Sequence, residues 1–444
     1  MTAPVFTPWT LFTDLGLIGL LLLIGKLVRV KVKLVQKLFI PPSLIAGLLG
    51  LVLGPEVLGW LPFSNFISVY PAILIALVFG ALPLSSDSSG FKSTFKRVVP
   101  LWAYSQFGML FQWGIMGIIG IVVFKAIWPE LNDAFGIMLS TGYYGGHGTA
   151  AAIGSAFENG GWNEAASLGM TTATVGVVLA IIGGLAIIKA ATKRGDTRFI
   201  TDFDNLPSEL RTGLIPEEKR ESSGKSTTSA ISIESLTFHF SLVLVSALGG
   251  YLLSLGVKKL NPSLDIPVFS AAFVVGILLK LLFSKTKVTD YIDRKTVYTI
   301  SSFCTDILVA CGVASIKLSV VVKYAVPLIC ILIVGALIVY FTVFFFGRRV
   351  IKNYWFEKSI FAWGWWTGTM AMGIALLRLV DPKQESKSMD DYALAYLPCA
   401  PVEILLITFV PIMFLQGHGL IFSVICALIG IAIILPFLIK KKNK

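Results

Sequence analysis

The stretch Ser140-Thr-Gly-Tyr-Tyr-Gly-Gly-His-Gly-Thr-Ala-Ala-Ala152 interrupts an apolar region of the chain with glycines and polar side chains. Gly145, Gly146 and Gly148 disfavour a continuous helix, which leaves backbone N–H and C=O groups without helical partners. Within a membrane, such groups occur only where protein buries them or where they line a hydrated cavity. Amide groups at a helix start attract carboxylates, whereas carbonyl and threonine oxygens suit Na⁺. The stretch therefore predicts an ion-binding loop; the alternative is a close-packed Gly/Ala helix crossing.

The rest of the chain has the composition of a membrane protein. Apolar residues make up 55% of the 444 residues, charged residues only 14%, and the mean hydropathy is +0.82. This composition excludes a soluble enzyme, a coiled coil and a disordered chain. A helix needs about 20 apolar residues to cross the hydrocarbon core. Apolar runs predict eleven spans: 9–28, 39–55, 66–84, 98–127, 164–190, 233–257, 264–284, 298–316, 320–347, 391–415 and 419–439.

Two further segments, 135–158 and 359–378, are too rich in Gly, Thr and Ala to be ordinary spans. If the N-terminus lies outside the cell, most of the 37 basic residues fall on the cytoplasmic side, which is the usual bias. The net charge of +12 then reflects membrane orientation and not nucleic-acid binding. The bias holds only if each broken segment enters and leaves by the same face. We therefore expect two re-entrant loops in a multi-pass protein of the cell membrane, with a cytoplasmic C-terminus.

The two halves of the chain resemble each other weakly. The Ile-Pro pair at 40–41 returns at 266–267, and Gly-Thr-x-Ala at 148–151 returns at 368–371. Each half holds five spans and one broken segment, so the second half starts on the opposite side of the membrane. Inverted repeats with interrupted helices are typical of secondary transporters. The alternative is chance similarity among Gly/Ala-rich helices.

The predicted fold is thus an all-α polytopic membrane protein with an inverted 5+5 repeat, two re-entrant loops and a C-terminal eleventh helix. The predicted divisions are a first repeat at 1–192, a polar cytoplasmic linker at 193–232, a second repeat at 233–417, and an extra span with a basic tail at 418–444.

The motif Gly145-Gly-His-Gly-Thr-Ala-Ala151 resembles the signature loop of the sodium/glutamate symporter family. The resemblance implies Na⁺-coupled symport of an acidic amino acid into the cell, with two re-entrant loops meeting near the membrane centre. It also implies homodimers and elevator-type movement. The second loop departs from the small-residue pattern of glutamate carriers, because Trp363, Trp365 and Trp366 fall within four residues.

Several residues are predicted to bind substrate or ions. Glu403 lies inside a span, where an isolated carboxylate is costly unless it faces a site, and Asp306 is a weaker case of the same kind. His147 either donates to a carboxylate or simply fixes the loop, and Arg378 either grips the substrate or marks the end of its segment. The full predicted set is Tyr144, Gly145, Gly146, His147, Gly148, Thr149, Thr367, Gly368, Thr369, Arg378 and Glu403, with Thr171, Thr172, Thr174 and Asp306 as weaker members and Na⁺ at Thr149, Thr369 and Glu403.

The predicted activity is Na⁺-coupled symport of glutamate or a similar anionic amino acid. The alternatives are a Na⁺- or H⁺-coupled carrier of another small organic anion, such as a di- or hydroxycarboxylate, and, from a different class, a channel. The sequence shows no HExxH motif, GxSxG motif or Ser/His nucleophile pair that would indicate an enzyme. We expect no cofactor beyond Na⁺ as coupling ion. The expected partners are the substrate anion, membrane lipid and, by the resemblance, a second copy of the chain.

Overall fold

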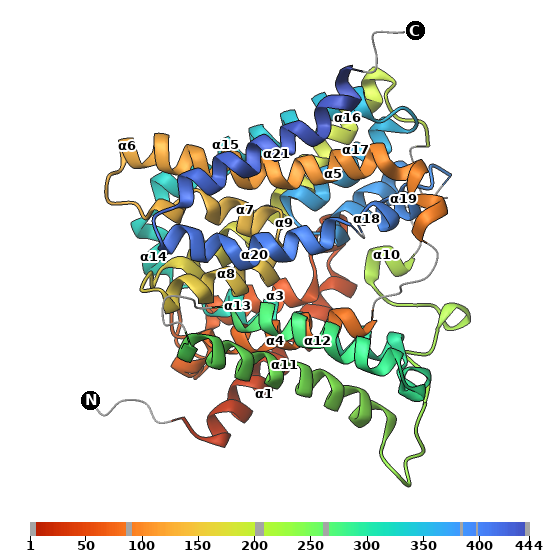
Figure 1. Cartoon of the computed structure of the whole chain (residues 1–444). Helices are drawn as coiled ribbons and strands as arrows, with labels where there is room; N and C mark the ends of the chain where they lie inside the picture. Colours follow the sequence, from red (N-terminus) through yellow and green to blue (C-terminus); the bar gives the residue numbers. More distant parts are fainter. Residues whose placement is uncertain are drawn as a thin grey trace. The chain divides into compact units, whose positions relative to one another are not determined.

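The computed structural model describes residues 6–85, 91–199, 208–260, 266–381, 385–396 and 398–439, and these residues form helices and connecting loops without a strand (Figure 1). Within these described ranges, eight helical segments are long and apolar enough to cross a membrane, so the chain is a multi-pass membrane protein. They are Pro8–Lys31, Asn65–Ser85, Val98–Ile127, Ala165–Arg194, Ser235–Leu260, Arg294–Ala314, Ala325–Val350 and Gly419–Ile439.

Three of the predicted spans form shorter helices. They are α3 (Pro42–Leu53), α12 (Val268–Ser284) and α20 (Cys399–Leu415), which fall short of the roughly 20 residues of a full span. Each begins at or directly after a proline, which fits the first turn of a helix but not its interior. The predicted span 391–415 is also divided, because α19 (Ser388–Tyr396) ends before α20 begins.

The chain divides into two compact units, and each draws on both halves of the sequence. The first unit comprises 1–25, 42–89 and 215–316. Its described helices are the start of α1 (Pro8–Lys31), α3, α4 (Tyr70–Ser85), α11 (Ser235–Leu260), α12 and α13 (Arg294–Ala314), with short turns η1 (Asn65–Ser68), η5 (Glu217–Lys219) and η6 (Lys287–Tyr291). In this unit α13 packs against α3 and α4, and α12 packs against α4 and α11.

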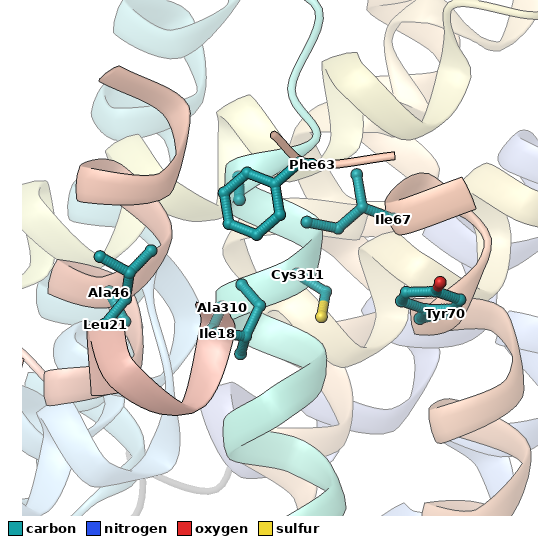
Figure 2. Close-up of a cluster of buried hydrophobic side chains, with 9 residues drawn as sticks. Ile18, Leu21, Ala46, Phe63, Ile67, Tyr70, Ala310 and Cys311 are labelled. Carbon is teal, nitrogen blue, oxygen red and sulfur yellow. The ribbon is translucent and has the colours of Figure 1, made fainter. Parts of the chain in front are cut away.

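The core of the first unit joins helices from distant parts of the chain. Figure 2 shows Ile18 and Leu21 of α1, Ala46 of α3, and Ala310 and Cys311 of α13 in one buried cluster. Small residues allow this close packing, because a Cβ added to Gly47 of α3 would collide with Val313 of α13.

A buried carboxylate also stabilises the first unit. Asp14 of α1 is 1% exposed and accepts hydrogen bonds from the Ser64 amide (2.9 Å), the Ser64 hydroxyl and the Tyr70 hydroxyl (2.8 Å). These donors satisfy the carboxylate without a cation. Asp14 therefore ties α1 to the chain that leads into α4.

The stretch between the halves docks onto the start of α13. The Lys225 amide donates to Asp293 (3.0 Å), the Thr299 hydroxyl donates to the Ser223 carbonyl (3.0 Å), and Lys295 pairs with Glu221 (2.7 Å). Asp293 is also the N-cap of α13. Part of the predicted linker, 215–232, therefore belongs structurally to the first unit.

The second unit comprises 26–41, 90–214 and 317–444. Its long helices are α5 (Phe91–Ile119), α9 (Ala165–Arg194), α15 (Ala325–Phe341) and α21 (Gly419–Ile439), and α5 runs beside α21 (Figure 1). The unit also contains α7 (Ile137–Tyr143), α8 (Gly146–Asn159), α17 (Trp355–Thr367), α18 (Met370–Val380), α19 and α20. Its shorter helices are α2 (Lys33–Lys37), η2 (Gly120–Phe124), α6 (Lys125–Ile127), η3 (Asp133–Phe135), α10 (Ser208–Thr212), α14 (Leu318–Lys323), η7 (Thr342–Phe346) and α16 (Gly347–Val350).

Candidate functional site

Both predicted broken segments are interrupted helices in the second unit. The first is interrupted between α7 and α8, at Tyr144 and Gly145, and Gly146 has a positive φ of 65°. The second is interrupted between α17 and α18, at Gly368 and Thr369. Glycine adopts a positive φ without the penalty that a side chain would bring, so the sequence explains where the first segment turns.

The first segment reverses its direction along α9. Before the break, the Met138 carbonyl accepts from the Thr172 hydroxyl at 2.7 Å, and the Tyr143 ring lies against Gly176. After the break, contacts return toward the start of α9, where Gly154 fits against Ala166. The chain thus forms a helical hairpin whose tip lies beside the middle of α9.

The second segment approaches α9 from its other end. Trp363 donates to the Ala180 carbonyl at 3.0 Å, and the Thr367 carbonyl lies so close to Gly176 that a Cβ there would collide with it. After the break the contacts run back toward Gly184, which packs against Leu376. Close packing of the two arms confirms the reversal, because a Cβ on Gly373 would lie 2.6 Å from the Phe361 carbonyl oxygen.

The two hairpin tips meet at Gly176 of α9. A Cβ built on Gly146 would lie 3.4 Å from both the Gly368 carbonyl oxygen and the Thr369 methyl carbon. The structure therefore brings the glycines and threonines of the two predicted loops together. The starts of α8 and α18 and the end of α17 all lie at this junction, so helix-terminal amides and carbonyls face one place.

Three polar side chains lie at the tips: His147, Thr149 and Thr369. His147, 4% exposed, lies 3.1 Å from the Thr174 hydroxyl through its Nε2 atom. Thr149 is buried against Gly145, and Thr369 caps α18 by accepting from the Met372 amide at 3.4 Å.

The remaining threonines are occupied within helices. Thr171 donates to the Ser167 carbonyl at 2.7 Å, and Thr367 donates to the Trp363 carbonyl at 2.6 Å. Thr172 donates to the Gly169 carbonyl of its own helix as well as to α7. Such hydrogen bonds use the hydroxyl proton but leave an oxygen lone pair that can accept or coordinate.

Glu403 is connected to the first tip by a series of aromatic ring contacts. Its carboxylate accepts a 2.8 Å hydrogen bond from the Tyr396 hydroxyl. The Tyr396 and Trp365 rings are 5.4 Å apart, and the Trp365 and Tyr144 rings are also 5.4 Å apart. Because α20 packs against α8, where Phe157 meets Phe414, Glu403 belongs to the same side-chain assembly as the hairpin tips.

One predicted residue lies away from the junction of the tips, and another belongs to the first unit. Arg378 is eight residues beyond the start of α18, about 12 Å along the helix axis. Asp306 belongs to the first unit, where it hydrogen-bonds Ser43 of α3. No cluster of three His, Cys, Asp or Glu side chains occurs among the described residues.

The three tryptophans of the second loop contact three different neighbours. Trp363 binds α9, Trp365 contacts Tyr144, Tyr392 and Tyr396, and Trp366 fits against Gly108 of α5. Their role in packing the hairpin explains why this loop is aromatic. The sequence did not predict these partners, because they come from helices distant along the chain.

A cavity of about 440 Å³ lies at the base of the second hairpin. Lys358 of α17 and Asp391 of α19 line it and form a buried ion pair of 2.9 Å. Tyr392 donates to the Lys358 carbonyl at 2.8 Å and stacks on Phe361 with ring centroids 4.2 Å apart. These contacts fix α17 to α19 between the cavity and the tip.

Interrupted helices that meet inside a multi-pass membrane protein are characteristic of secondary transporters. Comparison with known families gives the same class. Residues 10–371 match the sodium/glutamate symporter family, and the chain belongs to that family. A search of curated proteins finds no match.

Proposed function

We propose that the protein is a Na⁺-coupled symporter that carries glutamate or a similar anionic amino acid into the cell. The observation that carries the proposal is the meeting of Gly146 with Gly368 and Thr369 beside Gly176. The first amides of α8 and α18 would bind the substrate carboxylate, since helix N-termini favour anions. The Thr367 and Gly368 carbonyls, with Thr149 and Thr369, would coordinate Na⁺. Glu403 would bind Na⁺ or the substrate ammonium.

Anion and cation at one junction offset each other's charge, which favours joint binding over binding of either alone. Symport requires this coupling, because the tips should move only when the substrate and Na⁺ are both bound or both absent. His147 would hold the first tip on α9 through Thr174. The gradient of Na⁺ would then drive accumulation of the anion.

The inverted repeat remains part of the proposal, and three observations support it. The hairpins reach Gly176 from opposite ends of α9. The first unit takes its helices in equal number from each half of the chain. The π-helical turns η2 and η7 both come shortly before an interrupted segment. On this basis both hairpins would be re-entrant, with the N-terminus outside and the C-terminus in the cytoplasm.

Uptake by the purified protein in liposomes tests the proposal. An inward Na⁺ gradient should drive accumulation of radiolabelled glutamate above its equilibrium level, and an equal K⁺ gradient should not. Competition with aspartate, dicarboxylates and hydroxycarboxylates would rank the substrates. Indifference to every amino acid would favour the other-anion alternative, and ohmic currents without accumulation would favour a channel.

A further inference from the structure

Several polar side chains of the second unit are buried without a hydrogen-bond partner. Among the described residues they include both amide atoms of Gln112, the indole nitrogen of Trp366 and the hydroxyl of Tyr144. These three side chains are 3%, 1% and 2% exposed. Leaving a buried polar group unpaired is costly, so each such group requires an explanation such as a bound molecule.

A continuous series of contacts connects the three side chains. The backbone carbonyl of Gln112 accepts a hydrogen bond from the Ser140 hydroxyl at 3.0 Å, and Tyr144 is one turn beyond Ser140. The Tyr144 ring stacks near Trp366 at 6.3 Å.

Trp366 in turn contacts α5, the helix that carries Gln112. It packs against Gly108, which lies one turn before Gln112 on the same face of the helix. The unpaired groups therefore gather where α5 meets the first hairpin tip and the last turn of α17.

The chemistry of these groups limits their ligand. An indole N–H only donates, a tyrosine hydroxyl donates or accepts, and a carboxamide offers two donor protons and an acceptor oxygen. Together they supply more donors than acceptors and carry no formal charge. This arrangement suits the oxygen atoms of a carboxylate or carboxamide.

We propose that Gln112, Trp366 and Tyr144 form a neutral hydrogen-bonding subsite that recognises one oxygen-bearing end of the transported substrate. The inference rests on the proposed function. It adds Gln112 of α5 to the residues that determine substrate specificity. A neutral donor set requires no charge on its ligand, so it can hydrogen-bond a carboxamide as well as a carboxylate. The subsite therefore accepts the amide of an acidic amino acid as a competitor of the acid itself.

The test compares two buried glutamines of α5 in proteoliposomes under a Na⁺ gradient. Gln112→Met removes the amide at constant length and should raise the KM for glutamate about tenfold, the effect of one hydrogen bond to a charged group, without changing the Na⁺ dependence. Gln106→Met removes an equally buried and unpartnered amide from another face of α5 and should change KM less than threefold. Glutamine should compete with glutamate in the wild type and lose this ability in Gln112→Met.

The outcomes separate the two proposals. If the wild type accumulates no anion, the proposed function is wrong. If the wild type accumulates glutamate but Gln112→Met matches its KM, or Gln106→Met shows the same shift, the subsite is wrong while the function stands. Size-exclusion profiles and melting temperatures of both variants establish that each folds. For a variant that does not fold, Gln112→Asn and Gln106→Asn replace the methionine pair with the same expected contrast.

Discussion

Gly146 of the first hairpin faces the Gly368 carbonyl of the second, at a distance that leaves room for one methyl group and no more. Gly146 has a φ of 65°, and Gly59 has the same φ with nothing within 4 Å of a Cβ. The two glycines therefore separate the cost of backbone strain from the cost of filling the junction.

Gly146→Ala should reduce Na⁺-driven uptake at least tenfold, whereas Gly59→Ala should leave the uptake per folded molecule near the wild-type value. Both variants pay a left-handed backbone cost of about 1–2 kcal/mol, but only the first alters the tips. Uptake normalised to the amount of folded protein is the measurement. Equal losses in the two variants would show that the junction is not the site.

Gly176→Ala should displace the second hairpin from α9, because its methyl group would collide with the Thr367 carbonyl. We expect a fall in melting temperature and a loss of uptake of tenfold or more. Gly256→Ala is the control, since nothing lies within 4 Å of a Cβ there and alanine favours a helix by about 1 kcal/mol. Normal uptake by Gly176→Ala would refute the proposed meeting point.

Thr174→Val should impair uptake by removing the hydroxyl beside His147, an interaction of about 1 kcal/mol and hence several-fold in affinity. Thr171→Val, three residues earlier, removes only a hydrogen bond to its own helix and should have a smaller effect. The comparison uses the KM for substrate and for Na⁺. A larger effect from Thr171→Val would exclude the His147–Thr174 pair from the mechanism.

Glu403→Gln should weaken the dependence of uptake on Na⁺, because a neutral amide attracts a cation less than a carboxylate does. Tyr396→Phe, which removes the hydroxyl that donates to Glu403, should shift the same Na⁺ curve by a smaller amount. Uptake as a function of Na⁺ concentration at fixed substrate gives both values. An unchanged curve in Glu403→Gln would assign this carboxylate a structural role.

Asp293→Asn should release the docked stretch at 221–227 and expose the bond after Lys225 to trypsin at neutral pH. Burial opposes ionisation of Asp293, but the Thr296 hydroxyl and the amides of Lys225 and Thr296 outweigh it and lower the pKa of Asp293. Because its pKa is lowered, Asp293 stabilises the docked state at every pH above its ordinary pKa. This stabilisation is lost only as the pH falls through the pKa that Asp293 has in the docked state. Wild-type protection should therefore be equal at pH 7 and pH 5, and Glu221→Gln, at the exposed ion pair, should change it little. Rapid wild-type cleavage at pH 5 would contradict this.

The orientation of the chain is tested by a cysteine at the exposed position Glu218 in a background without the five native cysteines. A membrane-impermeant maleimide should label Glu218→Cys only after the cytoplasmic face is opened. Labelling of intact cells from outside would invert the proposed topology.

The breaks at both hairpins could be predicted from the sequence, because glycines at 145–148 and at Gly368 act locally on the backbone. The threonines Thr149 and Thr369 could be placed beside these breaks, because they adjoin the glycines in the sequence. The shortening of α3, α12 and α20 was not, because hydropathy extends across the prolines that start these helices. Gln112 and Asp14 carry no local signal, since only tertiary packing buries them and determines their partners.

Hydrogen exchange on the unmodified protein tests most directly whether both tips bind one substrate. Adding Na⁺ with the transported anion should slow amide exchange in peptides covering 144–149 and 367–372 together, and leave peptides around Asp306 unchanged. Protection of one tip alone, or of neither, would contradict a site shared by the two hairpins.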